Sequence, residues 1–407
     1  MTTDTISTST SLEKVANWDG NSQDISQVLT VAFDARDHLY CIRNLRALGI
    51  DPLSYINNLD KIIEDLPTKS ELRKRCIRAL RKTCGLYGVL PTSYAVTCTL
   101  SKPGPLCFAS GAFSDVWRLT DEDHCDRVFA VKSLRVYELD DTNEINKKYC
   151  KEVIVRKRAK HPNILSIEGV APKLFEFCMV SEWMPNGNIL EYITKHPAVD
   201  RLELVYLEHR RFDHTLTKLQ LIGVTRGLDY LHNNEVIHGG LRSSNILIDA
   251  KGSPRLSDFG LVSIKKDINS VNAEEPNHEY MVRYCAPELL DTEEAVWFKK
   301  KPTIKSDVYS LSMVIVELVT GNMPFPDLDD PDVITTVCVG GRPSKSLRSG
   351  APGITPAVWK IAQKCWNQKA NKRLEVNAVL QNLERIANPG DKQTPSPFKR
   401  AWRDIFD

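Results

Sequence analysis

Apolar positions near the start of the chain recur at helical spacing. Stretches such as ISQVLTVAF and SYINNLDKIIEDL show this period between residues 25 and 86, with Gly49 and Pro52 as breaks. Residues 1–24 are rich in Ser, Thr, Asp and Asn with little to bury, which predicts a disordered leader. We therefore expect a helical N-terminal region over residues 25–100. Its apolar stripes are too extensive to leave in water, so it should dock on the domain that follows.

The last segment of that region, KSELRKRCIRALRKTCG, combines an apolar stripe with a basic surface. Leu72, Cys76 and Leu80 form the stripe, and Gly85 is the expected C-cap. Six basic residues surround it: Arg73, Lys74, Arg75, Arg78, Arg81 and Lys82. We interpret them as a solvated face over a docked stripe, with an acidic partner or a membrane surface as the alternative.

After the Pro/Gly junction SKPGPL at 101–106 the period changes. VWRL and VFAVKSL alternate like strands, and helical patterns such as KLQLIGVTRGLDYLHNN and SDVYSLSMVIVELVTG dominate later. The pattern predicts an α+β, two-lobed domain over 101–386, with a small β-rich N-lobe at about 101–184 and a helical C-lobe at about 185–386. The Pro- and Ser-containing residues 387–407 predict a flexible tail.

The composition of the chain limits the classes of partner that we expect. The 407 residues carry a formal net charge of +2, which gives no global drive toward nucleic acid or membrane. No run of about 18 apolar residues predicts a transmembrane segment, and the 11 cysteines lack C-x-x-C pairs, which favours reduced thiols. We expect a cytoplasmic protein that binds no nucleic acid.

Several short motifs follow one another in a telling order. ASGAFSDVW occupies 109–117, FAVK ends at Lys132, Glu152 precedes HPNI by nine residues, and IHGGLRSSN, DFG (258–260) and APE (286–288) come later, with Asp307 in SDVYS and Arg373 as an expected partner of Glu288. In this order they resemble the protein-kinase signature set over about residues 107–386. The closest likeness is to the tyrosine-kinase-like group, in particular its expanded family in mushroom-forming fungi.

The resemblance implies a protein-kinase fold, ATP and Mg²⁺ as cofactors, and a protein substrate or signalling partner. It implies that Lys132 binds the α- and β-phosphates and that Glu152 holds Lys132 in place. Asn245 and Asp258 would bind the magnesium ion. Val116, Ala130 and Leu247 would sandwich the adenine, the backbone of Glu182 to Met184 would bond its edge, and Ser181 would be a small gatekeeper. The implied nucleotide-binding residues are Ala109, Gly111, Phe113, Ser114, Val116, Ala130, Lys132, Glu152, Ser181, Glu182, Met184 and Leu247.

Two loops depart from the family pattern. Ala109 and Ser114 replace two glycines of the phosphate-covering loop and leave Gly111, so the loop should be stiffer and nucleotide affinity lower. In the catalytic loop, Gly239 replaces the Arg that clamps an activation-loop phosphate, and Gly240 replaces the Asp that accepts the substrate's proton. Arg242 is retained where a cation assists the transferring phosphoryl group. One general base contributes about 10²–10⁴ in rate, so slow transfer stays physically allowed.

Two further features bear on the state of the domain. The resemblance implies that Ile167, Arg156, Phe259 and His238 stack in an apolar column. Arg156 must there snorkel or find a carboxylate, because its desolvation would otherwise push the helix of Glu152 outward. The second feature is the segment 205–220, whose removal restores a familiar helix length. Its codons are compatible with a short unspliced intron, and a genuine surface insertion is the alternative.

Three functions compete. A nucleotide-binding pseudokinase acting as a scaffold or allosteric partner is favoured by Gly240 beside intact Lys132, Glu152, Asn245 and Asp258. The second is a slow but active Ser/Thr or Tyr kinase. The third, suggested by Ala109 and Ser114, is an interaction protein that binds no nucleotide.

Overall fold

The computed structural model describes residues 3–20, 25–34, 38–68, 70–101, 104, 106–111, 114–123, 127–137, 141–196, 215–260, 281–290, 301–346 and 355–387. They form two compact units, each of which is described by itself. The first comprises the described residues up to 160 together with 166–183. The second comprises 161–165 and the described residues from 184 onward.

An antiparallel five-stranded sheet forms one part of the first unit. Its strands are β1 (Ala109–Ser110), β2 (Ser114–Thr120), β3 (Val128–Leu134), β4 (Ile167–Gly169) and β5 (Cys178–Glu182), in the spatial order β1-β2-β3-β5-β4. Alternate residues of β3 are buried, as the period of two predicts, and they pack in an apolar core with residues of β2 and β5. The β-rich small lobe expected from the sequence is thus present.

Helices make up the rest of the first unit. They are α1 (Thr3–Ala16), α2 (Ile25–Asp34), α3 (His38–Arg43), the 3₁₀ helix η1 (Arg46–Leu48), α4 (Pro52–Asp65), α5 (Glu71–Tyr87), η2 (Thr92–Tyr94) and α6 (Thr142–Arg158). The expected breaks are confirmed, because Gly49 caps η1 at φ 76° and Pro52 occupies the first turn of α4.

The prediction of a disordered leader was wrong for most of its length. Residues 3–16 form α1, in which Leu12 and Val15 are fully buried, and α1 packs against α2 and α4. The side-chain amide of Asn58 in α4 also donates to the carbonyl of Ala16 at 2.7 Å. A few apolar residues among many hydroxyls are enough for a helix when another helix supplies the surface that covers them.

The C-terminus of α5 lies three residues beyond the expected cap. The helix passes through Gly85 and ends at Gly88, which has φ 65° and donates its N–H to the carbonyl of Cys84. Gly85 is buried instead against α6, where a Cβ on it would lie 2.1 Å from Cε of Lys151. The glycine therefore permits close helix packing and does not end the helix.

Most of the basic surface of α5 is used within the chain. Arg73 donates to the carbonyls of Ile63 and Leu66 at the end of α4, where the peptide oxygens lack helical partners. Arg75 contacts Asp34 of α2 at 2.7 Å, and Arg78 contacts Glu71 at 3.5 Å. These contacts support the interpretation of a docked helix.

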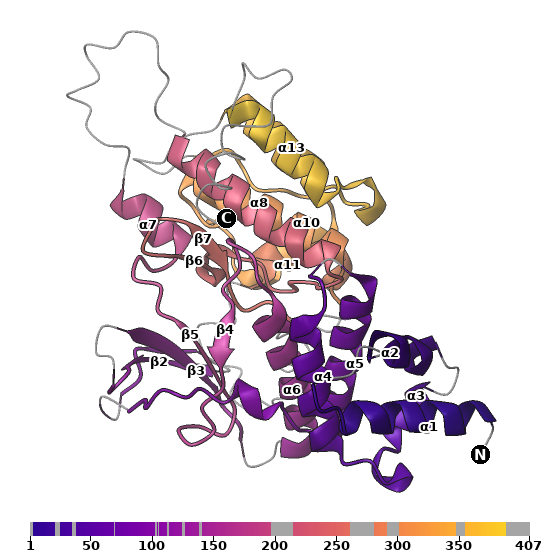
Figure 1. The fold of residues 1–407 in the computed structure, drawn as a ribbon. Helices are drawn as coiled ribbons and strands as arrows, with labels where there is room; N and C mark the ends of the chain where they lie inside the picture. Colours follow the sequence, from indigo (N-terminus) through magenta and orange to yellow (C-terminus); the bar gives the residue numbers. More distant parts are fainter. Residues whose placement is uncertain are drawn as a thin grey trace. The chain divides into compact units, whose positions relative to one another are not determined.

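The predicted docking of the helical region is confirmed within the first unit. Helix α5 packs against both α6 and α4, and the three helices lie close together in Figure 1. At the end of α6, the buried Arg158 forms ion pairs with Asp60 and Glu64 of α4. Its Nε also donates to the hydroxyl of Tyr94 at 3.1 Å. The region is thus attached to α6 by a buried ionic network.

The second unit is mainly helical, as expected. It contains α7 (Ile189–Lys195), α8 (Thr215–Asn233), α10 (Ile304–Thr320), α11 (Asp330–Cys338), α12 (Pro356–Cys365) and α13 (Val376–Ala387), with a small sheet of β6 (Ile246–Ile248) and β7 (Pro254–Leu256). The 3₁₀ turns are η4 (Ser243–Asn245), η5 (Val282–Tyr284), η6 (Pro287–Leu289) and η7 (Ala370–Lys372). Helices α8 and α13 lie side by side (Figure 1).

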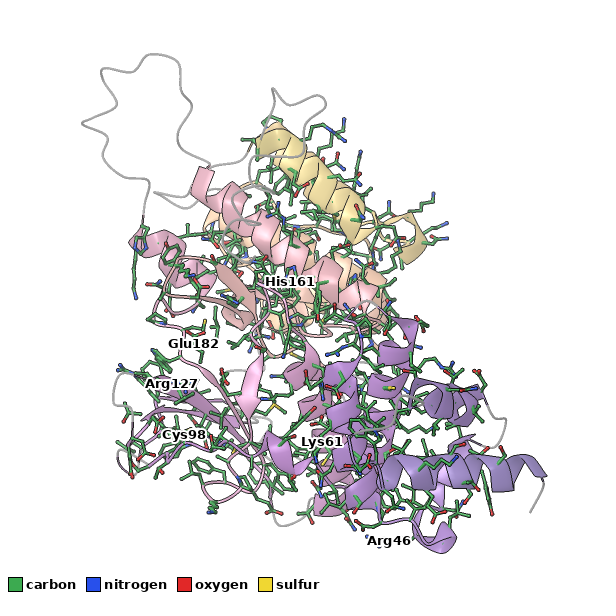
Figure 2. All side chains as sticks on the ribbon, viewed as in Figure 1. Arg46, Lys61, Cys98, Arg127, His161 and Glu182 are labelled. Atoms are coloured by element: carbon green, nitrogen blue, oxygen red, sulfur yellow. The ribbon has the colours of Figure 1, made fainter. Side chains whose placement is uncertain are left out.

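The short segment 161–165 is tied into this unit by polar contacts. His161, labelled in Figure 2, stacks on Tyr230 of α8 with ring centroids 4.9 Å apart. Its Nδ1 accepts the N–H of Asn163 at 3.1 Å, and burial lowers the pKa of His161 to about 4. The imidazole is therefore neutral at physiological pH, as this hydrogen bond requires.

Some predictions lie partly or wholly outside the described residues. The tail after residue 387 lies outside the described residues. Most of segment 205–220 also lies outside them, but its last residues belong to α8. Gln220 is buried there, and its Nε2 donates to the carbonyl of Gly252 at 2.8 Å. The ten cysteines in the described part are all free thiols. Within that part no helix has the length and apolar character needed to cross a membrane.

We predict that Arg158→Ala releases the helical region. Removing Arg158 leaves the buried carboxylate of Asp60 without its cation, which should lower the free energy of unfolding by about 3–5 kcal/mol. Limited proteolysis should then cut rapidly within 40–85, whereas the wild type resists. Lys147→Ala, which removes only a surface pair with Glu144, is the matched control. Equal cleavage of both variants would contradict this account.

Candidate active site

One face of the five-stranded sheet presents residues expected to hold a nucleotide. Lys132 lies opposite Val116, and Ala130 lies opposite Ser181. Cross-strand partners share a face, and so do positions two apart on one strand. The four side chains therefore project together, while the alternate residues of β3 point into the apolar core.

The other expected adenine contacts belong to different units. Glu182 ends β5 in the first unit, and Met184 begins the second. Leu247 lies in β6 opposite Arg255, and its bridge to Asn188 ties it to the start of α7. Each residue is placed within its own unit, so a shared adenine pocket stays a prediction.

The expected phosphate loop joins β1 and β2, which pair as antiparallel strands. Ala109 pairs with Val116, and the N–H of Gly111 donates to the carbonyl of Ser114 at 3.0 Å. Phe113 lies outside the described residues. The segment therefore retains a hairpin despite the loss of two glycines.

A polar clamp that sequence reasoning missed holds this hairpin. Arg135, just after β3, contacts Asp115 at 2.8 Å, and the hydroxyl of Ser110 donates to the same carboxylate at 3.0 Å. Partial burial alone would raise the pKa of Asp115, but hydrogen bonds from Arg135 and Ser110 hold it below its usual value. The clamp supports the expectation of a stiff loop. The clamp becomes apparent only from the strand register, which places Asp115 opposite Ser133.

Glu152 lies in the middle of α6, and its side chain is only 4% exposed. Helix α6 starts at Asp141, whose carboxylate accepts the N–H groups of Asn143 and Glu144. The Oε1 atom of Glu152 accepts from Nη2 of Arg81 at 3.1 Å. Arg81 belongs to α5, outside the segment that carries the kinase motifs, and no motif predicted this contact.

The catalytic-loop backbone is fixed by one buried carboxylate. Asp307, near the start of α10, accepts the N–H of His238 and the N–H of Gly239, each at 2.8 Å. His232 of α8 contacts the same carboxylate at 2.9 Å. Asp307 is only 1% exposed, so these bonds are shielded from water. The sequence contained Asp307, but its role becomes visible only in the structure.

Gly240 lies in this held backbone, at the position expected to carry the base. An added Cβ would meet no heavy atom within 4 Å, and the carbonyl of Gly240 accepts from Nδ2 of Asn245 at 2.7 Å. The preceding Gly239 has φ 71°, a region in which most side chains are strained. The loop thus keeps its frame and has room for a side chain at 240.

Asn245 and Asp258 are the two expected magnesium ligands, and both belong to the second unit. The bond to Gly240 orients the Asn245 amide, so Oδ1 is the end that can bind a cation. Asp258 has φ 58°, a conformation that Asp tolerates and that is enriched at functional sites. The N–H of Ser257 donates to the carbonyl of Asn245 at 2.8 Å, which ties the two segments together. This hard-oxygen donor set fits Mg²⁺.

The expected apolar column divides between the units. In the second, His238 and Phe259 are fully buried, with ring centroids 6.3 Å apart in an edge-to-face arrangement. In the first, Ile167 and Arg156 are also buried, Arg156 with 5% of its surface exposed. The structure thus confirms the contact of His238 with Phe259 and the burial of a guanidinium at Arg156.

A small pocket borders the catalytic loop. Gly239, Gly240 and Arg242 line it, together with residues of 281–289 and the start of α10. Beside it, Ser243 and Tyr284 both donate to Oε2 of Glu317. Burial raises the pKa of Glu317. Gly240 and Arg242 therefore border the same pocket.

The predicted ion pair of Glu288 with Arg373 is confirmed. Nη1 and Nη2 of Arg373 each donate to a different oxygen of Glu288 at 2.6 Å. The guanidinium is fully buried, and this bidentate geometry fixes the segment that follows the catalytic loop.

Comparison with known proteins identifies the family of the segment that carries these motifs. A family described as protein tyrosine and serine/threonine kinase matches residues 107–383. The serine/threonine-protein kinase STY46 of Arabidopsis thaliana is 27% identical over 280 residues, which are 69% of this chain and 43% of that protein. The serine/threonine/tyrosine-protein kinase HT1 of the same plant is 28% identical, and the match covers 68% of this chain and 64% of that protein. The tyrosine-protein kinase csk-1 of Caenorhabditis elegans is 27% identical, covering 56% and 38%.

The chain thus spans less than two thirds of the length of these relatives. The matched segment begins after α5, so the helical region lies outside it.

We predict that Asp307→Asn destabilises the second unit. An amide has one acceptor oxygen and would turn an NH₂ toward backbone donors, leaving at least one buried N–H without a partner. We expect the free energy of unfolding to fall by about 2–4 kcal/mol, measured by chemical denaturation. The exposed Asp327→Asn serves as the matched control. Unchanged stability of the Asp307 variant would refute the anchoring role.

Proposed function

The chain belongs to the family of protein tyrosine and serine/threonine kinases, and we propose that it is an ATP-binding member in which phosphotransfer is impaired. The observation that carries the proposal is Gly240, which stands in an intact catalytic-loop frame without the carboxylate expected there. The chain would act chiefly as a pseudokinase, a scaffold or allosteric partner in signalling.

The residues present suit the binding of ATP with magnesium. Lys132 projects from the nucleotide face of the sheet and would neutralise the α- and β-phosphates. Asn245 and Asp258 would hold the ion, which, when bound, shields the charge of the phosphates. Val116 and Ala130 would cover the adenine on the side of the sheet.

The missing part is the proton acceptor. In a complete site a carboxylate at 240 would orient the substrate hydroxyl and accept its proton as the phosphoryl group moves. Gly240 offers only a backbone carbonyl, and Asn245 already donates to it. Loss of one positioned base costs about 10²–10⁴ in rate. The charge of Arg242, which lines the same pocket, would remain to assist the phosphoryl group.

Because Arg242 remains although the base is missing, an active but slow kinase is the second candidate function. The loop frame and Arg242 favour it, because phosphoryl transfer depends mainly on positioning and charge. We further propose a place in the tyrosine-kinase-like group, supported by the likeness to both Ser/Thr and Tyr kinases. Membership of the expanded kinase family of mushroom-forming fungi and a cytoplasmic location are proposals from the sequence.

We predict that ATP with magnesium stabilises the chain against heat. At a free concentration of 100 times Kd the gain is about 2.7 kcal/mol, or a few degrees in melting temperature. Lys132→Met should remove most of this shift, and Asp258→Ala should remove its dependence on magnesium. No shift at millimolar ATP would favour the interaction protein that binds no nucleotide.

We also predict that Gly240→Asp raises phosphotransfer. The open space at this position admits the side chain, and the expected gain is about 10²–10⁴ in the rate of autophosphorylation with radiolabelled ATP. Gly240→Asn introduces a side chain of nearly the same shape as Asp but without a carboxylate base, so its rate should stay at the wild-type value.

A second substitution tests the origin of that gain. Asp258→Ala in the Gly240→Asp background should abolish it, because the magnesium ligand is lost. If Gly240→Asp binds ATP and still transfers no phosphate, Gly240 is not the main lesion. The buried Arg156 then becomes the next site to change, to Leu or Trp.

A further inference from the structure

The residue that contacts Glu152 comes from outside the kinase-like segment. Arg81 is in α5, and the family match begins at residue 107. Its guanidinium reaches a carboxylate that is only 4% exposed, whereas the Arg81 side chain itself is 42% exposed. A cation with access to solvent therefore holds the buried carboxylate on which the nucleotide lysine is expected to depend.

This contact is one of several along the length of α6. Near the start of the helix, Nδ2 of Asn146 donates to the carbonyl of Gly88 at 2.9 Å. In the middle, Lys151 packs over Gly85 at a distance that leaves no room for a Cβ. At the end, Arg158 is fastened to α4. Helices α4 and α5 therefore together support α6 along its length, and Glu152 cannot be moved with its helix unless this interface also moves.

The two cations make competing demands on one carboxylate. Lys132, on β3 in the same unit, is the partner that the family assigns to Glu152. In this structure Nη2 of Arg81 donates a hydrogen bond to Oε1 of Glu152. A carboxylate shared with a guanidinium binds a second cation less strongly, because its charge is already partly neutralised and its orientation is set by the first.

We propose that Arg81 is a positioning residue that competes with Lys132 for Glu152, so that the N-terminal helical region lowers the affinity of the site for ATP with magnesium. The proposal rests on the proposed nucleotide binding. It makes the helical region a built-in regulator, because any event that draws α5 away from α6 would remove Arg81 from the carboxylate and so strengthen the pairing of Glu152 with Lys132.

The test is the affinity of the full chain for a fluorescent ATP analogue with magnesium. Arg81→Gln removes the charge and keeps a polar side chain of similar reach, and we expect it to tighten binding about tenfold, within the range usual for coupled sites. Arg81→Lys keeps the charge and should bind like the wild type. Arg78→Gln, one turn earlier on α5 and paired with Glu71, is the matched control.

A double-mutant cycle with Lys132→Met separates competition from a general effect on the fold. If Arg81 acts through Glu152 and Lys132, Arg81→Gln should give no gain once Lys132 is replaced. A gain that persists without Lys132, an unchanged affinity, or a weaker affinity in Arg81→Gln would each overturn the proposal. Melting of the nucleotide-free variants shows whether they are folded, and Arg81→Lys provides the test should Arg81→Gln fail to fold, since loss of its wild-type affinity would also contradict competition for charge.

The failure of this inference is distinguishable from failure of the proposed function. If the wild type and every variant fail to bind the analogue, the proposed nucleotide binding itself is wrong. If the wild type binds and Arg81→Gln binds equally well, nucleotide binding stands and the regulatory role of Arg81 falls.

Discussion

The carboxylate of Asp307 is the constraint on which the candidate site depends. By accepting the N–H groups of His238 and Gly239 in a water-free environment, it fixes the path of the chain up to Gly240. Asn245 then fixes the carbonyl of Gly240 from the other side. Since both bonds involve backbone groups, they do not depend on the side chain at 240. The frame of the loop is therefore intact with glycine at 240, so the proposed loss of the base would be a local change.

The first unit is organised around α6 in a comparable way. Its one face meets the sheet through Tyr149, whose hydroxyl donates to the carbonyl of Cys178 at 2.5 Å. Its other side is fastened to α4 and α5 through Arg158 and Glu152. Buried ion pairs add little net stability compared with apolar packing, but they are costly to break and therefore specify one arrangement. This property suits a helix whose position decides where a functional carboxylate lies.

The sequence was most informative where chemistry requires particular residues in a particular order. The strands around Lys132, the pair Glu288–Arg373 and the contact of His238 with Phe259 were all predicted from motifs. Pattern reasoning failed where a distant segment decided the outcome. Helix α1 contains only a few apolar residues and forms against α4, so local composition alone indicated disorder. Gly85 looked like a cap because its role, close packing on Lys151, comes from a helix over 60 residues away.

In the function that we propose, the two unusual features of the site act on different steps, which would give the molecule two independent levels of control. On our proposal Gly240 would affect only the proton transfer that accompanies phosphoryl transfer, and it would have no direct part in holding ATP. Arg81, which donates to Glu152, would act on the expected ion pair with Lys132 and so on the binding of nucleotide before any chemistry occurs. A chain with the first feature alone would bind ATP persistently and turn it over slowly. With the second as well, nucleotide occupancy can follow the state of the helical region, which is the property that a scaffold needs if its partners are to sense ATP.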